Sequence, residues 1–240
     1  MASTTVATPT IRALARMSSF YSHARECYTF LVTYSFYILM MQTYEAKTFD
    51  LPTLDGISPK SVEEHIGLYQ AYVKNFNAMS QLILDLAADT EKNVHSLAEI
   101  RRRRSFEFGG MRLHELYFSQ WEGGAKAIDP ESSLSKALIE NFGGAGFDEM
   151  VKWVRMTGMM RGPGWSLLYW DPEVKAFQIG FSGEQHMGHF VNLPVVLALD
   201  VWEHAFILDY GAQGKGKYID AFFKNLNWEV VEKRFASITG

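Results

Sequence analysis

The stretch Asp200-Val201-Trp202-Glu203-His204-Ala205 is the most informative part of the chain. Asp200 and His204 are four residues apart, so on a helix they project from one face, one turn apart, and can reach the same metal ion. The segment 193–199 before them is apolar apart from one proline. We therefore expect the pair to be buried, where a charge needs a partner or a metal. From the spacing alone, an ordinary Asp/His pair on a helix surface is the more common case, because such polar pairs are frequent.

The composition is that of a globular protein. The 240 residues are 48% hydrophobic, 14% aromatic and 21% charged, enough for one large or two small domains. A net charge of −4 does not suggest a nucleic-acid partner. An anionic substrate would need a local positive patch, for which Arg101–Arg104 is a candidate, although such a run is also typical of a solvated helix face. The single cysteine, Cys27, excludes an internal disulfide framework and a cysteine-based metal site, so a metal would be Mn, Fe or Zn held by His, Asp or Glu.

Residues 1–42 differ from the rest. No acidic residue precedes Arg25, and the uncharged apolar stretch Tyr28–Met41 is shorter than the roughly 20 residues that span a bilayer. Three interpretations stay open: a signal peptide, an organellar transit segment, or an upstream start before a functional chain that begins near Met41. The last would leave the protein cytoplasmic and the others organellar or exported. Membrane contact of residues 28–41 stays open too.

After Met41 the hydrophobic periodicity predicts helices first and strands afterwards. The first expected helix is Ser61–Leu86, capped by Ser58 or by Ser61, the latter in a capping box with Glu64. A second helical region follows at Thr90–Leu116, interrupted near Gly109-Gly110. The later elements are short helices at Ser135–Asn141 and Phe147–Thr157, a hairpin of Gly164–Trp170 with Ala176–Phe181, a helix or strand–helix junction at Val201–Tyr210, and helices at Tyr218–Leu226 and Trp228–Phe235. This order predicts an α+β fold, in which an N-terminal helical hairpin precedes a small antiparallel sheet flanked by helices. We expect an extension at 1–42, a helical hairpin domain at 43–125 and a C-terminal α/β domain at 126–240.

Two of the seven histidines, His65 and His114, lie in apolar helical segments. A single histidine on such a face is usually a satisfied core residue. Two of them, together with the Asp200/His204 pair, make a site of three histidines and one carboxylate more plausible.

From Phe49 to Phe235 the chain resembles the iron/manganese superoxide dismutase family. The resemblance is carried by four blocks in the family's order: Glu64–Val73, His114–Phe118, Gly162–Trp165 and Asp200–Ala205. It implies that the metal ligands are His65, His114, Asp200 and His204, holding one Mn or Fe ion per subunit. It also implies an activity: converting superoxide to oxygen and hydrogen peroxide while the ion is alternately reduced and oxidised.

The resemblance also assigns residues around the ligands. Tyr72 matches the family's gateway tyrosine, and Trp165 and Trp202 are expected to wall the cavity. Iron-type members usually carry a glutamine or histidine four residues before the second ligand, where this chain has Gly110. Manganese-type members carry that residue after the hairpin, where Gln185 is the candidate and His186 the alternative. The pattern leans towards manganese.

By resemblance the chain forms a homodimer or a higher homo-oligomer, and Glu203 reaches across the interface. Ile207 replaces a tyrosine that bonds across the dimer, and the matching histidine is replaced by Tyr69 or its neighbour. The chain also has one residue fewer between His65 and Tyr72 than common members, and one more within Leu193–Asp200.

Two rival interpretations come from the same residues. A His/carboxylate site with open positions also suits non-haem iron oxygenases, but those use a β-barrel that this chain does not resemble. A non-catalytic metal-binding or structural member of the same fold would be expected to lack a ligand, and all four are present.

Overall fold

The first helix of the described residues is the long α2 (Pro59–Leu86). In the computed structural model, which describes residues 43–240, the Ser58 hydroxyl caps this helix by accepting the Ser61 amide at 3.1 Å. Pro59 occupies the first turn, where its missing donor costs nothing. Of the two expected caps Ser58 is confirmed. Ser61 is a buried helical residue, so the expected capping box is wrong. The expectations for residues 1–42 lie outside the described residues.

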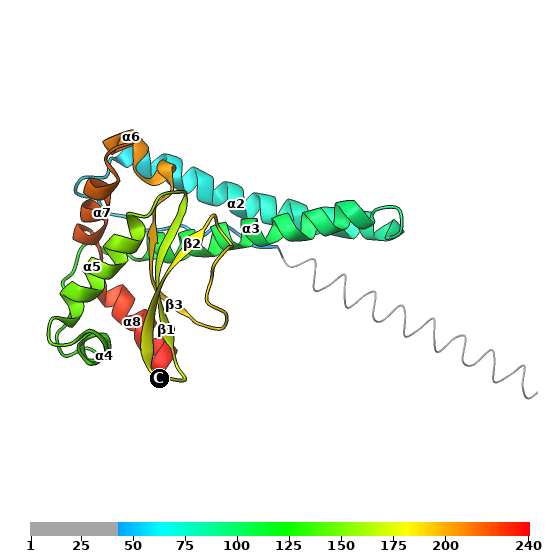
Figure 1. Ribbon diagram of the computed structural model, residues 1–240. Helices are drawn as coiled ribbons and strands as arrows, with labels where there is room; N and C mark the ends of the chain where they lie inside the picture. The colour runs from blue at the N-terminus through cyan, green and yellow to red at the C-terminus, as the bar shows by residue number, and fades with distance from the viewer. Residues whose placement is uncertain (1–42) are drawn as a thin grey trace, which may run out of the picture.

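Helix α3 (Val94–Ser119) follows the short helix η1 (Ala87–Asp89) and runs back along α2, so that the pair forms a long arm (Figure 1). It continues without a break through Gly109-Gly110, and the expected interruption is therefore wrong. The two glycines serve close packing instead. A Cβ on Gly109 would lie 1.9 Å from the Gln185 carbonyl oxygen, and one on Gly110 would lie 2.5 Å from Cδ1 of Tyr72.

The remaining elements pack a three-stranded sheet among short helices at the other end of the molecule (Figure 1). The strand order is β2-β1-β3, and both pairings are antiparallel. In chain order the elements are α4 (Ser133–Phe142), α5 (Gly146–Gly158), β1 (Gly164–Asp171), β2 (Ala176–Gly183), β3 (Val195–Asp200), η2 (Glu203–Ala205), α6 (Ile207–Tyr210), α7 (Lys215–Lys224) and α8 (Trp228–Thr239). The expected α+β class, with its helical hairpin ahead of a small antiparallel sheet, is confirmed. None of the described helices is both long and apolar enough to cross a membrane.

Strand β3 was not predicted as a strand, and its pairing places Asp200, the last residue of this edge strand, beside the start of the central strand β1. Trp165 on β1 lies opposite Ser182 on β2 and Asp200 on β3. Further along, Leu168 pairs with Leu197 and Tyr169 pairs with Val195, so that Val196 is left over as a β-bulge. A bulge inserts one residue into one strand, so it can absorb the additional residue before Asp200 without moving that carboxylate.

The side chain of Gln120 joins the end of α3 to this edge strand. Its amide donates to the Ala198 carbonyl, and its Oε1 accepts the Ala198 amide, both at 2.9 Å. A buried strand edge needs such partners, because unpaired backbone groups away from water are costly. The contact holds α3 and β3 together, and each contributes a residue to the site below.

Candidate metal centre

Four side chains from four separate elements meet between the helical arm and the sheet. They are His65 on α2, His114 on α3, Asp200 at the end of β3 and His204 in η2, here called the ligand cluster. Their candidate donor atoms all lie within 4.8 Å of one another. The Nε2 atoms of the three histidines lie 3.2, 3.6 and 3.3 Å from Oδ2 of Asp200, in the order just named. Donors bound about 2.1 Å from one ion lie about 3 to 4 Å apart, so the spacing fits a single metal ion.

The Asp200/His204 pair is not carried by one helix, as the spacing had suggested. Asp200 is the last residue of β3, and His204 lies in the 3-10 turn that follows. The Asp200 Oδ1 atom accepts the Trp202 amide at 2.8 Å. This bond folds the chain back, so that Oδ2 faces the His204 imidazole. The strand end and the turn therefore do what one helical turn was expected to do.

The imidazole of His114 is oriented as a metal ligand would be. Its Nδ1 lies 2.6 Å from the Gly110 carbonyl, which can only accept, so Nδ1 carries the proton and Nε2 is bare. That Nε2 is fully buried and has no hydrogen-bond partner among residues 43–240. Burial, with a smaller effect of His65, lowers the pKa of His114 to about 3. The ring is a neutral nitrogen donor with a lone pair directed at the other ligands.

Asp200 supplies the single negative charge of the ligand cluster. Complete burial opposes its ionisation, but the facing imidazoles of His204 and His65 outweigh that effect and lower the pKa of the carboxyl. The backbone is held as well, since the Tyr218 hydroxyl donates to the Asp200 carbonyl at 2.8 Å. Tyr117 in turn donates to Tyr218 at 2.9 Å.

Tyr72 and Gln185, predicted from separate parts of the sequence, are hydrogen-bonded to each other. The Gln185 amide nitrogen donates to the Tyr72 oxygen at 2.9 Å, and Gln185 Oε1 accepts the Trp165 indole N–H at 2.9 Å. The Tyr72 ring lies 5.1 Å from the His114 ring between centroids. One missing residue between His65 and Tyr72 therefore does not keep Tyr72 from the cluster, and α2 is a regular α-helix over that interval.

The side chain of His186, the alternative to Gln185, packs against a phenylalanine, whereas Gln185 is the one that lies between Tyr72 and Trp165. The His186 ring packs 5.7 Å from that of Phe106, which also contacts Tyr72 and Trp202. Gln185 is fully buried at the cluster, so the geometry favours it over His186. The sequence did not predict that Phe106 would lie next to Tyr72 and Trp202, because nothing in its local pattern distinguishes it from any other core phenylalanine.

The two predicted tryptophans line the cluster on different sides. The Trp165 ring lies 5.1 Å from the His114 ring, edge to face, and the Trp202 ring stacks on the His204 ring at 5.8 Å. Aromatic walls of this kind exclude water and strengthen the electrostatic interactions inside. Both tryptophans were correctly expected next to the ligands.

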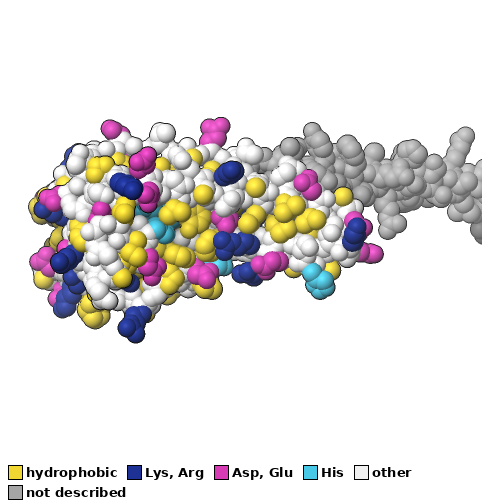
Figure 2. All heavy atoms as spheres, turned by 90° about the horizontal axis from the view of Figure 1, so that it is seen from above, with side chains coloured by type: hydrophobic (Ala, Val, Ile, Leu, Met, Phe, Trp, Pro, Cys, Tyr) yellow, Lys and Arg dark blue, Asp and Glu magenta, His cyan; other side chains and the backbone are white. Residues whose placement is uncertain are grey.

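The arginine run Arg101–Arg104 does not form one free positive patch. Arg102 pairs with Glu99 at 2.6 Å, and Arg103 pairs with the buried Glu107 at 3.2 Å while stacking on Phe106. On the face shown in Figure 2, positive and negative side chains are interspersed. The ordinary interpretation of the run as a helix surface fits these contacts better than an anion-attracting patch.

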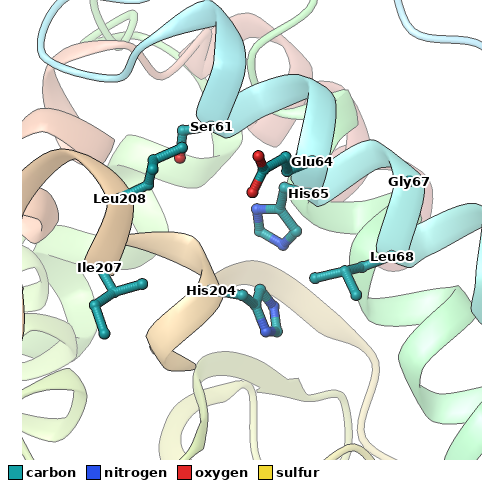
Figure 3. A pocket seen from close by; sticks show the side chains of 8 residues that line it. All are labelled: Ser61, Glu64, His65, Gly67, Leu68, His204, Ile207 and Leu208. Atoms are coloured by element: carbon teal, nitrogen blue, oxygen red, sulfur yellow. The ribbon is translucent and has the colours of Figure 1, made fainter.

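An opening of about 400 Å³ leads from the surface to two of the ligands (Figure 3). Its exposed apolar residues are Leu68, Ile207 and Leu208, here called the apolar rim; they are 40%, 48% and 45% exposed. Of the residues around Tyr69, Leu68 lines this opening, whereas Tyr69 is fully buried. The Tyr69 oxygen accepts the Lys47 amide at 2.8 Å instead.

Comparison with known proteins agrees with this geometry. The family model "Iron/manganese superoxide dismutases, C-terminal domain" matches residues 130–234. An iron superoxide dismutase of Aquifex pyrophilus is 32% identical over 76% of this chain and 85% of its own length. One of Tetrahymena pyriformis is 33% identical over 70% of this chain and 85% of its own length. A mitochondrial manganese superoxide dismutase of Glossina morsitans morsitans is 29% identical over 76% and 83%.

Proposed function

The chain belongs to the iron/manganese superoxide dismutase family, and from this premise we propose that it converts superoxide to oxygen and hydrogen peroxide at one ion held by the ligand cluster. The single observation that carries the proposal is the bare, buried Nε2 of His114 facing the Asp200 carboxylate. An unpartnered buried nitrogen is costly unless something binds it.

The donor set suits an ion that changes charge. Three neutral imidazoles and one carboxylate leave a divalent ion with one net positive charge and a trivalent ion with two, so neither state is strongly disfavoured. A bound iron or manganese ion supplies the one-electron chemistry. None of the four donors that the described residues bring together is a thiolate, which agrees with a preference for these harder metals.

The chain's own residues would govern the protons. Two superoxide ions and two protons give one oxygen and one hydrogen peroxide, so the site must deliver protons as well as electrons. Because the Gln185 amide donates to the Tyr72 oxygen, the Tyr72 hydroxyl proton is free to be donated to another acceptor. Burial, followed by the charge of Asp200, raises the pKa of Tyr72, so this hydroxyl stays protonated at neutral pH. Trp165 holds the other end of the Gln185 amide.

The preferred ion in this proposal is manganese. Gly110 leaves no room for a side chain against the Tyr72 ring, so the amide that faces the cluster comes from Gln185, the arrangement that leans towards manganese. The relatives named above include both iron and manganese enzymes. Elemental analysis and a superoxide assay on one purified sample test the proposal. Stoichiometric manganese with activity supports it, iron with activity corrects the metal, and a metal-loaded but inactive protein would favour the non-catalytic alternative.

We also propose that the chain forms a homodimer through the apolar rim. Three half-exposed apolar side chains next to a polar site are typical of an interaction surface. The rim itself contains no polar pair that would replace the tyrosine–histidine contact which the family resemblance implies across the dimer. Ile207→Glu should weaken association by more than about tenfold, because a charge would be buried. Val174→Glu, at an exposed valine on the β1–β2 turn, is the matched control. Sedimentation of the unmodified chain as a monomer at micromolar concentration would contradict the proposal.

A further inference from the structure

The turn between β2 and β3 carries a further inward-facing side chain, His189, besides Gln185 and His186. Met187, Phe190 and Val191 are 49%, 41% and 91% exposed, so the turn lies largely on the surface. Gln185 is fully buried and His189 is partly buried. Neither the family resemblance nor the ligand cluster gives His189 a task.

His189 joins the sheet to this turn. Its Nδ1 lies 2.9 Å from the Tyr169 hydroxyl on β1. Its Nε2 lies 3.2 Å from Ser182 Oγ on β2 and 3.4 Å from the backbone oxygen of Gln185. One imidazole thus contacts both neighbouring strands and the residue whose side chain reaches the cluster.

The protons in this network follow from its acceptors. Ser182 Oγ donates to the Met187 carbonyl at 2.9 Å, so it can only accept from His189. The Gln185 carbonyl can only accept as well, and His189 Nε2 therefore carries the proton. The bare Nδ1 then accepts from the Tyr169 hydroxyl. Burial is the largest effect on His189 and lowers its pKa, which agrees with a neutral ring that has one donor and one acceptor.

The backbone next to Gln185 needs support of this kind. Glu184, directly before it, has a φ of 53°, a left-handed conformation that costs a residue with a Cβ of the order of 1 kcal/mol. On the other side the Gln185 carbonyl approaches Gly109 so closely that a Cβ there would lie 1.9 Å away. A small rotation of this peptide would move the Gln185 amide away from Tyr72 and Trp165.

We propose that His189 is a positioning residue, which holds the Gln185 carbonyl so that the Gln185 side chain stays between Trp165 and Tyr72. The consequence for redox chemistry rests on the function proposed above, whereas the effect on the Gln185 side chain does not. His189 acts through Gln185, as outer partners of metal sites commonly do.

The first test uses metal-free protein, so it is independent of activity. The Trp165 indole proton is hydrogen-bonded to Gln185, and its exchange with solvent can be followed by NMR on protein with labelled tryptophan. His189→Ala should accelerate this exchange about fivefold to tenfold, the factor that one ordinary hydrogen bond represents. His189→Gln, which keeps one donor and one acceptor, should restore part of the protection. Val191→Ala, at the exposed end of the same turn, should leave it unchanged.

The second test uses metal-loaded protein. His189→Ala should shift the reduction potential of the ion in the same direction as Gln185→Ala, and by less. Should His189→Ala fail to fold, Tyr169→Phe removes only the hydroxyl that holds the imidazole and should accelerate the indole exchange as well. The proposal would be overturned if the Trp165 indole proton exchanged at an unchanged rate in His189→Ala, or in Tyr169→Phe where that variant replaces it. It would also be overturned if Val191→Ala accelerated the exchange equally. An unmodified protein without dismutase activity would contradict the proposed function and leave the exchange comparison valid.

Discussion

The ligand cluster and the turn that carries Gln185 are linked through Tyr72 but are held in different ways. Each candidate ligand lies on a helix, at the end of a strand or in the turn that follows it. The positions of these elements are set by the close-packed core. Gln185 instead depends on a mostly exposed turn with two non-glycine residues at positive φ, Glu184 and Asn192, near it. Changes in the turn should therefore alter redox tuning while the metal is retained, and changes in the cluster should lose the metal.

The strongest test of this contrast is His114→Ala. It removes the buried nitrogen that faces Asp200 and should lower metal affinity by more than about 100-fold, beyond the range seen for outer partners, with loss of activity. Metal content after dialysis and superoxide turnover measure the result. His95→Ala, at an exposed histidine of the same helix, is the control. Full metal content with normal turnover in His114→Ala would contradict the ligand assignment.

Gly109→Ala tests the turn without touching a ligand. The added methyl group would overlap the Gln185 carbonyl, so the turn must move, and we expect activity to fall by about 10-fold to 100-fold while metal stays bound. Gly67→Ala on α2, where nothing lies within 4 Å of an added Cβ, controls for the general effect of alanine on helix stability. If Gly109→Ala lost its metal together with its activity, the proposed independence of the two regions would be wrong.

Gln185→Ala should have a smaller effect, because it removes the amide but leaves the turn in place. We expect metal to be retained, activity to fall by about tenfold, and the reduction potential and the pH profile to shift. Gln178→Ala, at an exposed glutamine of β2, is the matched control. An unchanged potential and pH profile would reject the role proposed for Gln185.

The smallest expected effect concerns the stability of the metal-free protein. The pKa of His114 is lowered from 6.5 to about 3 in the folded state, so between these values the unfolded chain binds the additional proton. Stability should therefore fall as pH falls through this window, by up to about 1.4 kcal/mol per pH unit from this group. Urea unfolding followed from about pH 5 up to 6.5, the upper part of this window, should show a shallower dependence of stability on pH in His114→Gln. An identical slope would mean that another group controls the dependence.

The sequence was sufficient to name the four candidate ligands, because each lies within a local motif. His65 and His114 stand in apolar helical runs, and Asp200 and His204 stand in one six-residue block. Of the two arrangements expected for the last pair, one helix or a strand–helix junction, the structure has a strand end followed by a 3-10 turn. The identities of the residues did not depend on this choice, because four-residue spacing permits either geometry.

Other features depend on contacts between distant segments and have no local pattern. Gly109-Gly110 suggested a helix break, because glycine favours breaks in a single segment, whereas the structure uses both residues to admit Tyr72 and Gln185 at close range. His189 has no sequence signal at all, since its partners Tyr169 and Ser182 come from two strands.

By itself, the amino-acid sequence determined the class of fold, the family and the four candidate ligands, because hydrophobic periodicity and short motifs are properties of neighbouring residues. Only the tertiary structure decided that Gln185 and not His186 faces Tyr72, that α3 is continuous, and that His189 lies behind Gln185. Those outcomes depend on distances between residues far apart along the chain, which are set by the packing of α3 against the sheet and its turn.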